Sequence, residues 1–145
     1  MTANQEADSW ILEPSTSRIT EWIEQFETYS ALMPHIGRIA IPFLYPSKKD
    51  RRHQPPDQAR NIAAAWFAEG FNSEDSQRWL AAKFPHDESK FAGELRDAKV
   101  TPERLDETIV HPVTGQPSTV LVVAYTARHD FPSVGKALDA AGYVA

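Results

Sequence analysis

A short motif that marks helix ends recurs along this chain and constrains its fold more than any other feature. The first copy spans residues 66–71, where Gly70 precedes a final aromatic residue. Further copies follow at 79–84, 95–100 and, as a more distant match, 138–143. Glycine at this place supplies the left-handed cap of a helix, and the apolar residue after it folds back onto the last turn. Each copy therefore predicts the end of a helix, with a different ending expected where lysine replaces glycine.

Residues that favour helix starts follow the first three copies. Asn72 and its polar neighbours come after the first, the acidic pair at 87–88 after the second, and Pro102 after the third. Acidic groups in a first turn complement the helix dipole, and proline suits the first helical position. The spacing predicts helices over 58–70, 73–83 and 87–99, followed by a short turn over 102–107.

An amphipathic helix is expected before these repeats. Apolar residues recur there at spacings of three and four, namely Ile19, Trp22, Ile23, Phe26, Tyr29 and Met33. Ser15 offers a cap for the start of the helix, and Pro34 with Gly37 ends it. Residues 38–45 then alternate in hydrophobicity and predict a strand, which Pro42 confines to the edge of a sheet.

After Thr108, the spacing of the apolar residues changes from that of helices to that of strands. Residues 108–113, a turn around Gly115 and residues 119–126 predict a β-hairpin. The second strand is apolar on both faces, so it must be covered on both sides. A final helix over 133–141 and the N-terminal helix are the elements expected to cover it.

These elements define an α+β fold that is mainly helical. Consecutive short helices are followed by a β-hairpin, in a sheet of two or three strands, and by a C-terminal helix. At 145 residues the chain fits a single domain, 1–145, with residues 1–16 expected as a flexible N-terminus. No cysteine occurs, which excludes disulfides, thiolate metal sites and cysteine nucleophiles. The N-terminus lacks the pattern of a targeting signal, so we expect a cytoplasmic protein. Residues 120–127, the most apolar run, are too short to span a bilayer, so we expect no membrane contact.

The Trp, Gly-Phe, Glu/Asp pattern of residues 62–105 resembles a short helical repeat found in uncharacterised proteins of actinobacteria and their mobile, phage-like elements. The third copy has lost both the tryptophan and the glycine. The resemblance implies stacked short helices and a contact surface, and it transfers no functional residue.

No residue pattern points to catalysis, a cofactor or a bound metal. The five histidines, His35, His53, His86, His111 and His129, show no zinc-binding spacing, and the glycines form no phosphate-binding loop. The aromatic residues Trp66, Trp79, Phe71, Phe84 and Phe91 are expected in the core. His129 beside Asp130 is the one place where acid–base chemistry would have an imidazole and a carboxylate at hand, which leaves a small enzyme as a third hypothesis.

A basic segment inside an acidic chain is the strongest electrostatic feature. The net charge is −5, yet residues 48–60 carry five basic and two acidic groups. Prolines bracket residues 46–57, so we expect an exposed loop there. Its candidate partner-binding residues are Tyr45, Lys48, Lys49, Arg51, Arg52 and His53. The contrast in charge favours docking on an acidic macromolecule.

The sequence therefore predicts a non-enzymatic adaptor or regulatory protein that binds another macromolecule, most readily a protein. The alternative is a winged-helix-like DNA-binding regulator, since three helices precede the hairpin. Its DNA contacts would be Lys90, Arg96 and Lys99, although residues 87–99 carry a net charge of −1, whereas a groove-reading helix is normally cationic. The oligomeric state stays open.

Overall fold

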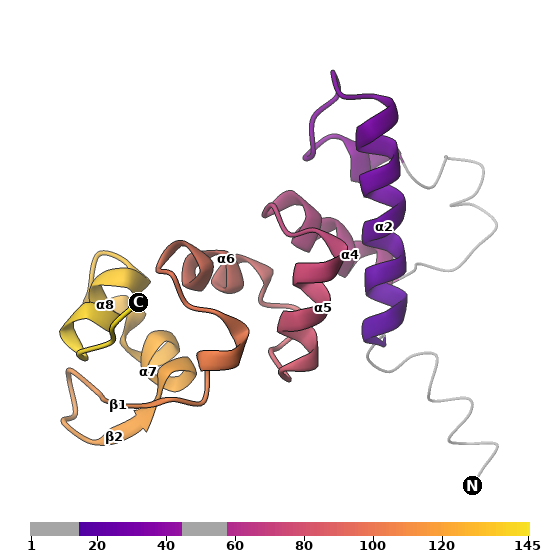
Figure 1. Ribbon diagram of the computed structural model, residues 1–145. Coiled ribbons are helices and arrows are strands. Elements are labelled where there is room, and N and C mark those ends of the chain that lie inside the picture. The colour runs from indigo at the N-terminus through magenta and orange to yellow at the C-terminus, as the bar shows by residue number, and fades with distance from the viewer. Residues whose placement is uncertain (1–14, 45–57) are drawn as a thin grey trace, which may run out of the picture. The chain divides into compact units, whose positions relative to one another are not determined.

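A computed structural model describes residues 15–44 and 58–145 of the chain (Figure 1). Contacts group the chain into two compact units, unit 1 (Met1–Ala81) and unit 2 (Ala82–Ala145). Over the described residues the fold is α+β and mainly helical, with six α-helices and one two-stranded antiparallel sheet, which confirms the expected fold class. The expected single domain stays a prediction. The flexible N-terminus expected over residues 1–16 falls almost entirely outside the described residues, as does the loop expected over 46–57.

Unit 1 is a packed set of three helices. They are α2 (Thr16–Leu32), α4 (Gln58–Ala68) and α5 (Ser73–Ala81), with a short 3-10 helix, η1 (Ile41–Leu44), after α2. Helix α2 packs against both α4 and α5, as Figure 1 shows. Its apolar stripe is buried at Ile19, Ile23 and Phe26, and the Phe26 ring lies 5.6 Å from that of Phe67 on α4.

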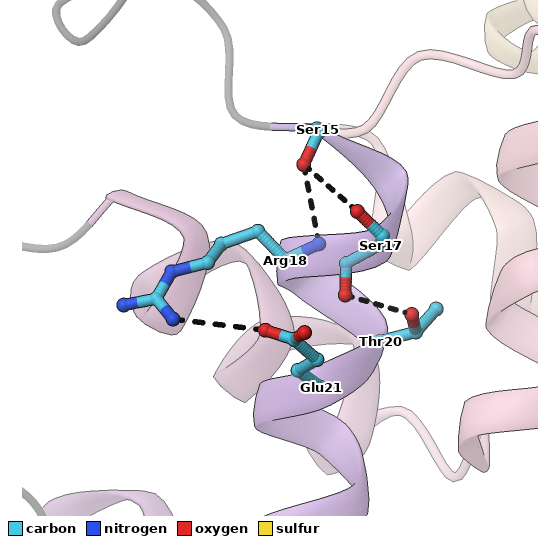
Figure 2. Close-up of polar contacts among 5 residues, drawn as sticks. All are labelled: Ser15, Ser17, Arg18, Thr20 and Glu21. Atoms are coloured by element: carbon cyan, nitrogen blue, oxygen red, sulfur yellow. Dashed lines mark hydrogen bonds and ion pairs between the residues drawn. The ribbon is translucent and has the colours of Figure 1, made fainter.

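The start of α2 follows from its serines (Figure 2). Ser15 is the N-cap, and its hydroxyl accepts a hydrogen bond from the backbone N–H of Arg18 at 3.2 Å. The Thr20 hydroxyl donates to the carbonyl of Ser17, and Arg18 lies 3.7 Å from Glu21 in an exposed ion pair. The Ser15 hydroxyl thus satisfies one of the backbone donors that a helix start leaves without intrahelical partners.

The recurring motif ends helices in both units. Residues in the left-handed region follow α4, α5, α6 and α8 at Gly70, Lys83, Lys99 and Gly142. After α4 the N–H of Phe71 donates to the carbonyl of Trp66, and the N–H of Gly70 donates to that of Phe67. The same two hydrogen bonds close α6 at Leu95–Val100 and α8 at Leu138–Tyr143. The expectation that lysine copies end differently is wrong, because Lys83 and Lys99 adopt the glycine-like backbone.

Unit 2 combines three helices with the hairpin. Its elements are α6 (Ser89–Asp97), η2 (Pro102–Arg104), β1 (Thr108–Val110), β2 (Pro117–Thr119), α7 (Val120–Ala127), η3 (Arg128–Asp130) and α8 (Val134–Ala140). The strands pair in register Thr108 to Thr119 and Val110 to Pro117. Helix α8 packs against α7 and α6. The core holds Leu95, Val123, Ala124 and Leu138.

The apolar run 120–127 is a helix, so the strand predicted over 119–126 is wrong beyond Thr119. The buried residues Val120, Val123, Ala124 and Ala127 follow helical spacing, which a run of uniformly apolar residues conceals. The Thr119 hydroxyl caps this helix by accepting from the N–H of Val122. The final helix does pack on this segment, as expected, whereas α2 covers α4 and α5 within unit 1.

The edge strand predicted over 38–45 is also wrong. The chain forms a turn and then η1, in which Ile41 is buried while Ile39 is 68% exposed. Pro42 cannot donate to a strand ladder and fixes φ at a helical value, so it suits the short helix. The aromatic residues expected in the core, Trp66, Trp79, Phe71, Phe84 and Phe91, are all buried, which confirms that prediction. Over the described ranges no helix has the length and hydropathy needed to cross a bilayer.

Candidate functional site

Two adjoining apolar grooves on unit 1 form the candidate site. One has a volume of about 320 Å³ and lies between η1 and α4; the other, of about 640 Å³, lies along the turn after α2. Ile39 and Ala68 line both grooves. We call this surface the apolar groove; its other lining residues are Ile36, Gly37, Arg38, Ala40, Pro42, Arg60, Asn61, Ala64 and Ala65.

The outer face of α4 supplies one wall of the apolar groove. Ala64, Ala65 and Ala68 lie on the side of the helix opposite to its buried residues Ala63 and Trp66. A helix normally turns polar residues outward, and small residues there allow another backbone to come close. Together with Ile39, this face leaves apolar surface exposed beside a concave wall.

Two arginines hold the shape of the apolar groove. The Arg38 side chain donates to the carbonyls of Phe67 and Phe71, both at 2.9 Å, and its guanidinium carbon lies 3.7 Å from the centre of the Phe67 ring. Burial lowers the pKa of Arg38, while the negative charge of Glu27 partly offsets that shift. Arg60 donates to the carbonyl of Pro42 and so ties α4 to η1. The turn is therefore fixed against α4 by charged hydrogen bonds.

The partner-binding residues predicted from sequence cannot be placed, since Tyr45, Lys48, Lys49, Arg51, Arg52 and His53 lie outside the described residues. The chain passes into that segment directly after η1 and returns at the start of α4. Both ends of the basic segment therefore adjoin elements that line the apolar groove.

The three residues of the DNA-binding alternative do not share one face. Lys90 and Arg96 are 120° apart around α6, on the geometry of 100° per residue. Arg96 lies 3.4 Å from Asp97, and Lys99 is the left-handed residue that closes the helix. Lys90 and Glu94, four positions apart on α6, form no ion pair with each other, and both residues line a cleft of unit 2.

A structural role explains His111, one of the five histidines in the sequence. The ring is buried, and its Nδ1 accepts hydrogen bonds from the N–H groups of Val113 and Thr114. Nε2 therefore carries the proton and donates to the Thr126 hydroxyl at 2.9 Å, which in turn donates to the carbonyl of Val122. This neutral imidazole joins the hairpin turn to α7.

The remaining histidines of the described ranges are scattered. His35 is exposed, His86 precedes α6, and His129 accepts a hydrogen bond from the Nε of Arg128 at 3.2 Å. His129 and Asp130 are neighbours in η3, but no hydrogen bond joins their side chains. Across residues 15–44 and 58–145, no three histidine or carboxylate side chains gather as metal ligands.

Comparison of the chain with protein-family models, with curated proteins and with solved structures returned no match in any of the three. Only the surfaces of this chain therefore indicate what it does. Sequence reasoning did not find the apolar groove. The usable signal was the alanine stripe at 64, 65 and 68 on the face of α4 opposite to its aromatic residues.

Proposed function

We propose that this protein is a non-enzymatic adaptor or regulator that binds another protein through the apolar groove of unit 1. The observation that carries the proposal is Ile39, which is 68% exposed and lies where the two grooves meet. Exposed apolar surface of this kind, set in a concavity, is typical of interaction sites. Leu32, near the end of α2, is 74% exposed and belongs to the same unit.

The partner that fits is an amphipathic segment with acidic residues. An apolar helix face laid into a groove is a common mode of peptide recognition. Residues 48–60, which run into the start of α4, carry five basic groups. These charges favour a partner segment with acidic residues at its edges. Lys48, Lys49, Arg51, Arg52 and His53 would act together with the groove. Cytoplasmic residence is part of the proposal.

The test is affinity capture from the native host with three forms of the full chain. Ile39→Glu places a charge in the groove, a second variant reverses Lys48, Lys49, Arg51 and Arg52, and Val144→Glu is the control because Val144 is exposed in unit 2. We expect one specific protein to co-purify with the wild type and the control and to be lost from both other variants. Equal recovery of that protein with Ile39→Glu contradicts the proposal.

A DNA-binding regulator remains the second candidate, with Lys90, Arg96 and Lys99 as its contacts. The acidic residues of α6 do not favour it, because phosphate neutralisation supplies most of the affinity for DNA. A nuclease-treated sample in the same experiment separates the two functions. Material lost on nuclease treatment supports nucleic-acid binding, and a partner that survives supports the adaptor.

A further inference from the structure

A cleft of about 320 Å³ in unit 2 is distinct from the apolar groove. It lies between α6 and the segment that joins α7 to α8. Charged side chains dominate its lining, whereas the walls of the apolar groove are mostly aliphatic. The residues that matter are Glu88, Lys90, Phe91, Glu94, Arg128 and His129.

Arg128 is held in place by aromatic rings. Its guanidinium carbon lies 3.8 Å from the centre of the Tyr125 ring and 5.6 Å from that of Phe91. Those two rings meet edge to face at 5.3 Å, so α6 and α7 together form a fixed base for the guanidinium. A side chain fixed in this way loses little conformational entropy when it binds a ligand.

The terminal nitrogens of Arg128 are available for a ligand. The Nε donates a hydrogen bond to the Nε2 of His129 at 3.2 Å, and this contact does not involve the two Nη groups. No carboxylate of the described residues forms an ion pair with Arg128. The two Nη groups can therefore donate hydrogen bonds to both oxygens of a carboxylate.

Two acidic residues, Glu88 and Glu94, line the same cleft, and neither forms an ion pair with another described residue. Glu88 is the N-cap residue of α6, yet its side chain makes no capping hydrogen bond. Glu94 lines the cleft six residues further along the chain and forms no ion pair with Lys90. The cleft thus offers two cations, Lys90 and Arg128, and two anions, whose charges sum to zero but are not paired with each other.

We propose that this cleft binds a small zwitterion of the α-amino acid class. The ligand carboxylate lies on the Nη edge of Arg128, with Lys90 as the second cation, and its ammonium group faces Glu88 and Glu94. A simple anion would meet two unneutralised carboxylates, and a simple cation would meet Arg128 and Lys90, so complementarity selects a molecule that carries both charges. The volume is at the small end of ligand sites.

The experiment titrates the full chain with individual L-amino acids and follows its ¹H–¹⁵N spectrum, including the Arg128 Nε–H signal. We expect at least one amino acid to give saturable shifts confined to Arg128 and to the backbone of residues 88–94 and 128–134. Acetate and methylammonium, which carry the two charges separately, should bind at least about tenfold more weakly, a difference of ~1.4 kcal/mol.

Two variants and a control locate the binding. Arg128→Lys keeps the charge but loses the planar fork, and Glu94→Gln removes an exposed carboxylate with little risk to the fold; each should weaken binding at least about tenfold. Arg96→Lys is the control, since Arg96 does not line the cleft. Acetate that binds as tightly as every amino acid, or no saturable shift up to about 10 mM, overturns the proposal. Unchanged affinity in Glu94→Gln also overturns it.

Discussion

The carboxyl end of α4 in unit 1 and that of α6 in unit 2 have the same hydrogen bonds but different residues. In α4 the left-handed residue is Gly70, with φ of 96°, and in α6 it is Lys99, with φ of 68°. The following residues, Phe71 and Val100, donate to carbonyls five positions earlier in both helices. The geometry of the helix end is therefore set by the fold-back of the apolar residue, and glycine only lowers its cost.

The two ends also differ in how they are anchored. Phe71 packs on Trp66 with ring centres 4.9 Å apart, and Arg38 donates to its carbonyl from the turn after α2. Val100 returns onto Leu95, and both are buried aliphatic residues. At the end of α4, glycine adopts the left-handed conformation without strain, and aromatic and charged contacts anchor the fold-back. At the end of α6, a lysine adopts the same conformation with strain, and the burial of two aliphatic residues holds it in place.

The largest expected effect comes from removing the residue onto which each end folds back. Trp66 is fully buried, so Trp66→Ala should lower the free energy of unfolding by about 3–5 kcal/mol, and Leu95→Ala by about 2–5 kcal/mol. Urea unfolding of both variants measures these losses. The tryptophans of the described residues, Trp22, Trp66 and Trp79, all lie in unit 1, so their fluorescence follows that unit.

Because these tryptophans lie in unit 1 and Leu95 lies in unit 2, the same experiment tests whether the chain unfolds as a single domain. If the chain unfolds as one domain, Leu95→Ala shifts the tryptophan transition by as much as it shifts the amide signals of unit 2. A tryptophan transition that Leu95→Ala leaves unchanged would contradict the single domain and make the two units independent.

An exchange of the left-handed residues should change stability in opposite directions. Gly70→Ala places a Cβ in a left-handed conformation and should cost about 1–2 kcal/mol. Lys99→Gly relieves that strain but adds freedom to the unfolded chain, so the net gain should be about 0.5–1 kcal/mol. Thermal unfolding of both variants, with exposed Lys136→Gln as a neutral control, measures the difference. Destabilisation by Lys99→Gly would show that the lysine side chain itself stabilises the end.

The sequence predicted most helices because their ends carry local chemistry. Gly70, Asn72 and Pro102 act within one or two turns, so their effect does not depend on the rest of the chain. The strand predicted over 119–126 was wrong because this segment carries little local chemistry that distinguishes a helix from a strand. Residues 120–125 are six consecutive apolar residues and show no period, and the helix is selected by the Thr119 cap and by packing against α8.

The candidate sites were harder to predict because both depend on contacts between distant segments. The apolar groove needs residues 36–42 to lie against α4, which Arg38 and Arg60 accomplish through backbone carbonyls up to 33 positions away. The cleft of unit 2 needs Arg128 to stack between α6 and α7. Neither arrangement follows from spacing in the sequence, whereas the aromatic core does, because its residues recur at helical intervals.

The smallest expected effect concerns a third helix end, that of α8, where Tyr143 folds back onto Leu138. Arg104 lies 4.3 Å from the centre of the Tyr143 ring and donates two hydrogen bonds to Glu107, at 2.8 and 2.9 Å. The hydrogen bonds from Arg104 lower the pKa of Glu107 below its ordinary value of 4.5, although desolvation acts in the opposite direction. Because the folded state binds this proton less readily than the unfolded state, the stabilisation is present above the unfolded pKa and is lost as the pH falls through the folded one.

We therefore expect Glu107→Gln to be slightly less stable than the wild type near neutral pH, where the wild type has this stabilisation, and to converge with it at low pH, so that its acid limb is flatter. The measurement is the urea midpoint of wild type and variant between about pH 3 and pH 6. Asp106→Asn, which removes the carboxyl of an exposed residue next to Glu107, controls for the general loss of a negative charge. Parallel acid limbs for the wild type and Glu107→Gln would contradict this prediction. They would mean that Arg104 stabilises the end of α8 only through its contact with the Tyr143 ring. Arg104 would then resemble Arg38, which stabilises the end of α4 without a hydrogen bond to a carboxylate.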